Sequence, residues 1–327
     1  MKEDDWDQMK SNLDVITLGE LLIDFVSVKR GVYLKEAPGF EKDAGGAPAN
    51  VTVACSRLGL KSGFIGKVGA DEFGLFLIDA LEKEGVDVTN VYLDKMASTM
   101  LAFVSVAKDG ERDFIFYGEP RADMQLAPDE INKDYIARAR VFHFGSISLA
   151  SDPARSATLR AVNAAKDSGL TITYDPNLRL NLWESDAEAK KWIRIGLEKA
   201  DVVKMDDKEA EFLMGPGVER AAEELLGYVS KVFISLGSKG CYYADDDSCG
   251  YSAPYRVNVR DTTGAGDGFM GGVIYGILRK WKMEKMASFS NAVGALTTCG
   301  TGGIPSLPTL NTVLDLLSRG RGRDKTR

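Results

Sequence analysis

Histidine is almost absent from this sequence of 327 residues, and several kinds of catalytic site are absent with it. The single histidine, His143, lies in the apolar run Val141–Phe144, so we expect a packed imidazole and no Ser-His-Asp triad. The four cysteines have no C-x-x-C spacing, and no Cys/His cluster has the spacing of a zinc site. Walker A, protein-kinase and dinucleotide-binding strings are missing too. These absences count against triad hydrolases, zinc enzymes, P-loop proteins and protein kinases.

Long apolar runs and a positive net charge are also lacking. No run approaches the length needed to span a bilayer, and the acidic residues 1–6 lack the apolar core of a secretory signal. The net charge of −7 counts against nucleic acid as the main partner. Residues 319–327 are basic and contain no apolar residue, so we expect a disordered tail. We predict a cytoplasmic protein with reduced thiols and with neither a nucleic-acid nor a membrane partner.

The sequence does contain a regular alternation of short β-branched or aromatic runs with amphipathic helical patterns. We expect strands at 15–18, 64–68, 141–144, 170–174, 202–204 and 232–236, and helices at 49–58, 73–84, 155–168, 187–199 and 218–228. Asp152-Pro153 and Ser185-x-x-Glu188 provide helix start signals. This alternation predicts an α/β fold in which helices cover both faces of a mostly parallel sheet, in one domain spanning residues 1–327.

Two segments, at about 24–44 and 96–120, break the alternation, and within them Asp24–Tyr33 and Thr99–Tyr117 have the pattern of extended chain. Within the second, Ala102–Val104 and Phe114–Phe116 predict a hairpin joined through Lys108–Glu111. We interpret these segments as a small β lid that projects from the main domain, with an ordinary edge hairpin as the alternative. Aromatic residues on both of its faces need cover, which a second lid could provide, so we expect a homodimer through the lid.

Residues Asp261–Asp267, which read DTTGAGD, are the most informative stretch of the chain. The small residues Gly264, Ala265 and Gly266 let backbone N–H groups converge on one point. The apolar stripe that follows predicts a helix beginning at Gly266, whose positive end would form an anion site beside Asp267. An Asp that only complements the helix dipole is the alternative. A phosphate next to a fixed carboxylate suggests phosphoryl transfer, in which Asp267 takes the proton of the attacking hydroxyl.

A second motif, GGAPANV, spans residues 45–51 and is followed by Leu58-Gly59 and by GKVGADEFG at 66–74. Its paired glycines let a sugar approach the backbone, and Asn50 offers both a donor and an acceptor to hydroxyls. With these two motifs the chain resembles the ribokinase-like (pfkB) carbohydrate kinases over roughly residues 15–310, and its details are most similar to bacterial and plant fructokinases. The resemblance implies a three-layer α/β/α fold with a β lid. It also implies transfer of the γ-phosphoryl of ATP, with Mg²⁺, to the primary hydroxyl of a sugar, most simply D-fructose.

Residue roles follow from the same resemblance. Asp267 would be the general base, and the backbone of Gly264, Ala265, Gly266 and Asp267 would form the anion hole. The residues implied for the sugar are Asp24, Gly45, Gly46, Asn50, Phe103 and Arg179. Those implied for the nucleotide are Asn177, Lys204, Glu209, Ser235, Gly237, Gly240, Gly264, Gly266 and Asn291. Glu209 is the candidate for Mg²⁺, and Asp261 and Thr263 are candidates for a K⁺ site.

Two departures from the family pattern leave alternatives open. Gly118 stands where an Arg is common, although Arg121 lies three residues on, and Asp206 replaces the Asn of an Asn-x-x-Glu motif. Gly118 weakens the case for an acidic sugar, and Asp24 argues against one because like charges repel. The acceptor could still be 2-keto-3-deoxygluconate, ribose or a nucleoside. A kinase-fold protein that binds without catalysing is the remaining alternative.

Overall fold

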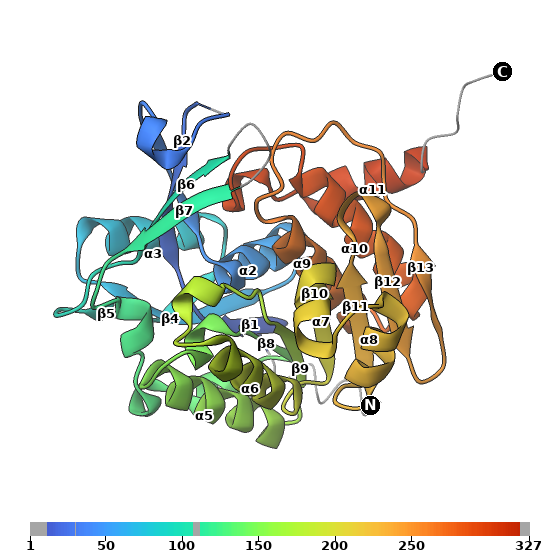
Figure 1. The fold of residues 1–327 in the computed structure, drawn as a ribbon. Coiled ribbons are helices and arrows are strands. Elements are labelled where there is room, and N and C mark those ends of the chain that lie inside the picture. The colour runs from blue at the N-terminus through green and yellow to red at the C-terminus, as the bar shows by residue number, and fades with distance from the viewer. Residues whose placement is uncertain (1–11, 30, 107–111, 321–327) are drawn as a thin grey trace.

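Nine strands form one large sheet within residues 12–29, 31–106 and 112–320, the part of the chain that the computed structural model describes (Figure 1). Their order is β13-β12-β11-β10-β9-β8-β1-β4-β5. All neighbours from β5 to β11 are parallel, whereas β12 and β13 are antiparallel to their neighbours. The prediction of a mostly parallel sheet is therefore confirmed. The strands are β1 (Val15–Leu18), β4 (Ser62–Gly69), β5 (Asp87–Asp94), β8 (Val141–Gly145), β9 (Thr171–Asp175), β10 (Val202–Asp206), β11 (Lys231–Ser235), β12 (Cys241–Asp245) and β13 (Cys249–Ser252).

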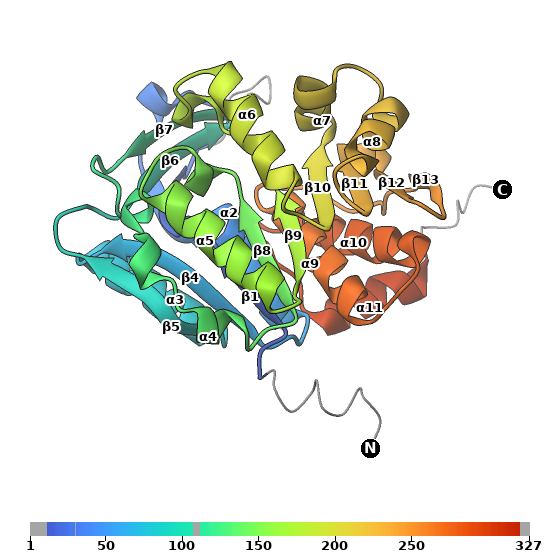
Figure 2. The same cartoon turned by 90° about the horizontal axis from the view of Figure 1, so that it is seen from below.

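Helices cover both faces of this sheet, as predicted. One face carries α4 (Lys133–Ile136), α5 (Ala154–Asp167), α6 (Asp186–Leu197), α7 (Asp207–Met214) and α8 (Val218–Leu226). The other carries α2 (Ala47–Arg57), α3 (Glu72–Lys83), α9 (Ala265–Leu278), α10 (Met283–Thr297) and α11 (Leu310–Arg319). Alternate residues of the central strands point into the two cores, so Phe142 faces the α5 side whereas Val141 faces the α9 side. Figure 2 shows α5 and α6 lying over β8 and β9.

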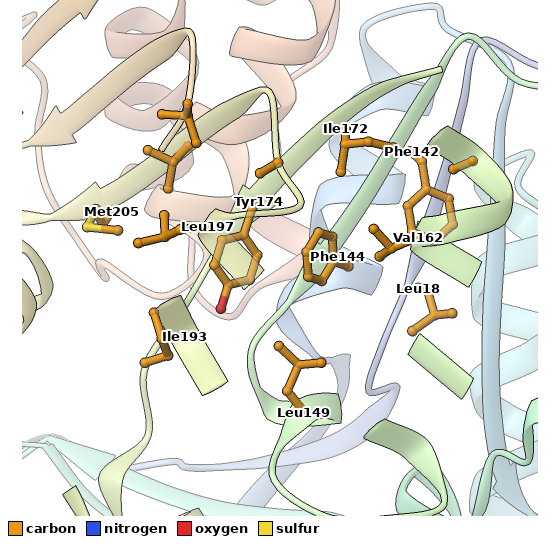
Figure 3. Close-up of a cluster of buried hydrophobic side chains, with 14 of the residues drawn as sticks. Leu18, Phe142, Phe144, Leu149, Val162, Ile172, Tyr174, Ile193, Leu197 and Met205 are labelled. Carbon is orange, nitrogen blue, oxygen red and sulfur yellow. The ribbon is translucent and has the colours of Figure 1, made fainter. Parts of the chain in front are cut away.

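The core on the α5 side is built from large side chains of the central strands (Figure 3). Phe142 and Phe144 of β8 alternate with His143, which faces the other way. Phe144 stacks on Tyr174 of β9 with ring centroids 4.5 Å apart. His143 is fully buried, and its Nδ1 pairs with the Thr173 hydroxyl at 3.1 Å. Its burial and this hydrogen bond confirm the prediction of a packed imidazole. Burial, and after it the charge of Lys204, lowers the pKa of His143 to about 3, so the ring is neutral at pH 7.

A separate four-stranded sheet in the order β3-β2-β6-β7 projects from the main body (Figure 1). It consists of β2 (Leu22–Ser27), β3 (Phe40–Gly45), β6 (Leu101–Val106) and β7 (Arg112–Tyr117) and is called the lid below. The predicted hairpin is present, since Ala102 pairs with Phe116 and Val104 with Phe114. Its expected turn, Lys108–Glu111, lies outside the described residues. The expected extended segment from Asp24 ends at Ser27, and a short 3₁₀ helix follows at Leu34–Glu36. That the whole chain is one domain stays a prediction.

Several boundaries differ from the predictions for physical reasons. Strands β5, β12 and β13 were not predicted. The edge strands β5 and β13 are partly exposed and lack continuous apolar runs, whereas β12 lies inside the sheet and is mostly buried but is only five residues long. Pro153 is itself the N-cap of α5, so the helix begins one residue later than Asp152-Pro153 indicated. The Ser185 side chain caps α6 as expected, but Glu188 bonds to Lys191 and Trp192 instead of completing a capping box.

Three further features bear on the predictions from composition. Of the predicted tail, Arg319 belongs to α11, and residues 321–327 lie outside the described part. All four cysteines are described and are free thiols. None of the described helices has the length and apolar character needed to cross a membrane. The remaining short 3₁₀ helices are Ala122–Gln125, Pro128–Glu130, Ile147–Leu149, Leu180–Leu182, Gly237–Lys239 and Ile304–Ser306.

The packing of Phe142 predicts a large loss of stability on truncation. We expect Phe142→Ala to lower the free energy of unfolding by about 3–5 kcal/mol, because it removes buried apolar surface and leaves a cavity. Urea denaturation measures this loss. Leu75→Ala is the matched control, because its side chain on α3 is exposed, and it should change stability by less than about 0.5 kcal/mol. Similar losses in the two variants would contradict the assigned core.

Candidate active site

The turn before α9 has the geometry expected for an anion site. Gly264 is the N-cap of α9 and adopts a left-handed conformation with φ of 75°. The helix begins at Ala265, one residue earlier than predicted. The Ala265 N–H donates a long hydrogen bond to the Thr262 carbonyl, with a distance of 3.3 Å between nitrogen and oxygen. The N–H groups of Gly264, Gly266 and Asp267 are therefore the better donors toward a bound anion.

Asp267 lies in the first turn of α9 and is held by two amides from distant parts of the chain. Its Oδ2 accepts a hydrogen bond from Asn50 Nδ2 at 2.8 Å, and its Oδ1 accepts one from Asn177 Nδ2 at 3.3 Å. Desolvation raises the pKa of Asp267 to about 6, although the Asn50 hydrogen bond and the charges of Lys204 and Arg179 act against the rise. Such a carboxylate is ionised at neutral pH and is basic enough to accept a proton.

Asn50 has one polar atom left for a ligand. The side chain is buried, its Nδ2 is used by Asp267, and its Oδ1 has no hydrogen-bond partner. Gly303 comes close to this amide, because a Cβ built there would lie 2.9 Å from Oδ1. An unpaired buried acceptor is costly, so a hydroxyl donor of a substrate would satisfy it.

Asp24 reaches the same region from the lid. It packs against Gly45, where a Cβ would lie only 2.1 Å from Asp24 Oδ2, so a larger residue at position 45 would displace the carboxylate. Desolvation raises the pKa of Asp24 to about 7, the charges of Asp43, Asp267 and Asp261 add to the rise, and Arg179 opposes it. Asp24, Gly45, Asn50, Asp267 and the charge of Arg179 therefore lie around one site, as the sequence predicts.

Asp43 is a residue of this site that sequence reasoning missed. It is directly opposite Asp24 in the antiparallel pair of β2 and β3, and its Oδ2 lies close to Gly302 of the body. Desolvation, followed by the charge of Glu41, raises its pKa. The register of the two lid strands was the signal that could have found it, because cross-strand partners share one face of the sheet.

Lys204 and Asp175 form a buried ion pair beside the anion turn. The Nζ atom donates to Asp175 Oδ2 at 2.8 Å, and a Cβ at Gly266 would lie 2.8 Å from the same Nζ. Desolvation lowers the pKa of Lys204, but the carboxylates of Asp175, Glu209 and Asp267 together raise it by more. The ammonium is therefore charged and lies next to the position expected for a phosphate.

Glu209 is a structural anchor in this arrangement. Its Oε1 accepts from the Leu178 N–H at 2.6 Å and its Oε2 from the Asp206 N–H at 2.8 Å. Asp206, which stands in place of the Asn of the family motif, caps α7 in return by accepting from the Glu209 N–H. Burial, and after it Asp175, raises the pKa of Glu209 to about 7. Both oxygens of Glu209 are thus engaged by the chain itself, and its predicted role as a Mg²⁺ ligand stays untested.

The loop after β9 brings two more predicted residues to the site. Asn177 has a positive φ of 44°, which aims its side-chain amide at Asp267. Arg179 donates to the neighbouring Leu178 carbonyl at 3.0 Å, and its charge lowers the pKa of both Asp24 and Asp267. A guanidinium near enough to lower the pKa of both carboxylates suits the charge of a transferring phosphoryl group.

The predicted nucleotide residues near β11 lie at the carboxyl end of that strand. The Ser235 hydroxyl donates to the Met205 carbonyl, and Gly237 and Gly240 frame the turn after the strand with φ of 56° and 92°. Asn291 of α10 donates to the carbonyls of Ser252 and Ala253 at 3.0 and 3.3 Å. Asn291 therefore supports the wall of the predicted nucleotide site, and direct contact with a nucleotide stays a prediction.

Asp261 and Thr263 lie directly before the anion turn. Asp261 Oδ1 accepts from the Thr263 N–H and hydroxyl at 3.0 and 2.9 Å, and Oδ2 accepts from the Gly302 N–H at 3.0 Å. No group of three His, Cys, Asp or Glu side chains could hold a metal ion in the part of the chain described here. Binding of K⁺ by these residues stays a prediction.

Two residues are not brought to the site in the way that the sequence suggested. Phe103 pairs with Phe25 and stacks on it, so it lies on the opposite face of the lid from Asp24. Within one chain it is therefore not placed to contact a sugar beside Asp24. Arg121 does not replace the Arg missing at Gly118, because it is buried in a bidentate pair with Asp123.

The site combines an anion-binding helix start, a carboxylate base and a hydroxyl-binding cradle at the carboxyl end of a parallel sheet. These features define a small-molecule kinase. A family model described as pfkB family carbohydrate kinase matches residues 12–310. The chain belongs to this family and is a sugar kinase.

Individual relatives agree with this assignment. Fructokinase-2 of Solanum lycopersicum is 46% identical over 316 residues, which cover 94% of this chain and 96% of that protein. An uncharacterised sugar kinase from Pyrococcus horikoshii, solved in complex with ATP, is 36% identical with a TM-score of 0.82, covering 94% of this chain and 98% of the other. A fructokinase from Vibrio cholerae O395, solved with fructose, ADP and calcium, is 30% identical with a TM-score of 0.83, covering 93% and 99%.

The raised pKa of Asp267 predicts the pH dependence of turnover. A general base acts only when it is ionised, and with a pKa of about 6 the ionised fraction of Asp267 falls as the pH decreases below that value. We therefore expect kcat to be nearly constant from about pH 7 to 8 and to fall about tenfold per unit well below pH 6. Initial rates at saturating sugar and ATP measure this. A kcat that stays constant down to about pH 4.5 would contradict a base with this pKa.

Proposed function

We propose that this sugar kinase transfers the γ-phosphoryl group of ATP to the primary hydroxyl of D-fructose and forms fructose 6-phosphate. The observation that carries the proposal is the position of Asp267, a base with a pKa of about 6 in the first turn of α9. It accepts a hydrogen bond from the side-chain amide of Asn50, whose Oδ1 has no hydrogen-bond partner in the chain and is left for a sugar hydroxyl. The similarity to curated fructokinases over 94% of the chain supports fructose as the sugar.

The residues of the site would act in a simple sequence. Asp24 and Asn50 bind sugar hydroxyls and orient the primary hydroxyl toward Asp267, which removes its proton as the oxygen attacks the γ-phosphorus. The bond between the γ-phosphorus and the oxygen that bridges it to the β-phosphate breaks, and ADP leaves. The N–H groups of Gly264, Gly266 and Asp267, with the charges of Lys204 and Arg179, stabilise the negative charge of the transferring group. The lid closes over the sugar and excludes water, which limits hydrolysis of ATP.

A magnesium ion is expected with the nucleotide. The described residues offer no acidic cluster to cage it, so the phosphates and water would supply most of its ligands, as is usual for this ion. Its charge would neutralise the phosphates. Activation by K⁺ at Asp261 and Thr263 is part of the proposal, as is the cytoplasmic location expected from the four reduced thiols.

The acidic groups around the sugar position favour a neutral acceptor. Asp24 and Asp43 lie side by side on the lid, with Asp267 and Asp261 close enough to raise the pKa of Asp24. An acidic sugar such as 2-keto-3-deoxygluconate would bring another negative charge into this group. Ribose and nucleosides remain alternatives that the charge pattern alone does not separate from fructose, and initial rates on a panel of acceptors would separate them.

Removing the base should abolish most of the turnover. We expect Asp267→Asn to lower kcat for fructose by about 10²–10⁴-fold, with little change in the KM for ATP, because the amide keeps the shape but cannot accept the proton. A coupled assay of ADP formation measures both constants. The matched control is Asp79→Asn on the exposed side of α3, which should leave kcat unchanged. Near-wild-type turnover in Asp267→Asn would remove Asp267 from the mechanism.

We also propose that two copies of the chain associate through their lids. The lid face opposite Asp24 carries an apolar groove of about 610 Å³, lined by Phe40, Leu101, Phe103, Ile115 and Tyr117 together with Leu34 and Lys35. The side chains of Ile115 and Tyr117 are 46% and 56% exposed. The same face on a second lid is self-complementary in a two-fold dimer, and it would cover these side chains.

Light scattering tests the dimer directly. We expect a mass of about 71 kDa at micromolar concentration, twice the chain mass of 35.5 kDa. Ile115→Lys should give the monomer, because it places a charge in the centre of the apolar face. Leu314→Lys on α11, an equally exposed apolar residue on another element, should remain a dimer. A monomeric mass for the unmodified chain would refute association through the lid.

A further inference from the structure

We propose that Glu20 is a positioning residue for the sugar, which holds the start of α2 in place from outside the site. The inference rests on the proposed function for the identity of the sugar. Glu20 lies between β1 and β2, is 3% exposed and does not belong to the set of residues around Asp267. It acts on the sugar cradle through a backbone group.

The start of α2 has no cap of its own. Its N-cap residue is Gly46, with φ of 109° and no side chain to accept a hydrogen bond. A larger residue is excluded there, because a Cβ would lie 2.3 Å from the Glu20 carbonyl oxygen. Because the Glu20 backbone leaves room only for glycine at position 46, the N-cap residue has no side chain that could accept a hydrogen bond. The start of α2 therefore needs an acceptor from another segment of the chain.

Glu20 supplies this acceptor. Its Oε1 accepts a hydrogen bond from the N–H of Ala47, the first residue of α2, at 3.0 Å. A carboxylate at this place also complements the positive end of the helix. One turn later the Asn50 N–H donates to the Gly46 carbonyl at 2.8 Å, and the Asn50 side chain bonds to Asp267. The hydrogen bond from Ala47 to Glu20 therefore fixes the backbone that carries both the paired glycines and Asn50.

The surroundings of Glu20 are built to hold a buried carboxylate in one position. Arg121 and Asp123 form a buried bidentate pair nearby, and the charge of Arg121 lowers the pKa of Glu20 while that of Asp123 raises it. Desolvation is the largest influence and brings the pKa of Glu20 to about 7.

Glu20 also lies where chain segments enter and leave the lid. β1 leads through Glu20 into β2, β3 leads through Gly46 into α2, and β7 leads into Arg121. The segment before β6 is bound to the same place, because the Ala122 N–H donates to the Ser98 carbonyl at 2.9 Å. A displaced Glu20 would therefore shift Asp24 and Asn50 relative to each other and leave the predicted ATP site intact.

Two variants separate the reach of this side chain from its charge. Glu20→Asp keeps the charge but is one methylene shorter, so it cannot reach the Ala47 N–H. Glu20→Gln keeps the length and an acceptor oxygen but loses the charge. We expect Glu20→Asp to raise the KM for fructose about tenfold and Glu20→Gln to raise it less than about threefold, with the KM for ATP within about twofold in both.

The experiment measures kcat and both KM values, with the rise in melting temperature on adding fructose as a second, binding-only readout. Thr309→Ala is the control: it removes the N-cap of α11, a helix that carries none of the site residues, and should leave both KM values unchanged. The proposal is wrong if Glu20→Asp matches the wild type, if Glu20→Gln is as impaired as Glu20→Asp, or if both KM values rise together. The wild-type rate on fructose tests the proposed function separately, and if another acceptor is used the same comparison is made with that acceptor.

Discussion

The hydrogen bond between Asn50 and Asp267 is the interaction on which the site depends. It joins α2 to α9, two helices whose contact residues are 217 positions apart, and it sets the distance between the sugar cradle and the base. The low exposure that makes this bond strong also raises the pKa of Asp267, so one feature orients the base and makes it basic. The remaining residues of the site are arranged around this pair.

The site is divided between a rigid part and a part that can move. The large sheet and its helices hold Lys204, Asp175, Glu209 and the anion turn through buried ion pairs and backbone hydrogen bonds. The lid contributes Asp24 and Asp43, and its strands join the body near Glu20 and Gly46. Phosphate binding is thus built into the packed core, whereas recognition of the sugar is shared between the core and a small sheet at its edge.

The sequence predicted the parts of this arrangement that short-range patterns encode. The central strands, their flanking helices, the lid hairpin and the anion turn each have a local signature, because periodicity and small residues act over a few positions. The partners of those residues could not be predicted in the same way. Asp43, the capping role of Glu20 and the burial of Arg121 depend on strand register and on contacts between distant segments. The family resemblance implied Phe103 beside the sugar, but only the register shows which face of the lid it occupies.

Side chains of β2 point alternately to the two faces of the lid, so the arrangement of the lid depends on the number of residues in this strand. Asp24 and Phe25 are neighbours in the sequence, yet Asp24 faces the carboxylates of the site and Phe25 stacks on Phe103 on the opposite face of the lid. Replacing either residue alters one face alone. Inserting or deleting a single residue between Gly19 and Ser27 would exchange the two faces, turning aromatic rings toward the base and carboxylates toward the outer surface. A replacement in this strand that keeps Asp24 is therefore less disruptive than a change in its number of residues.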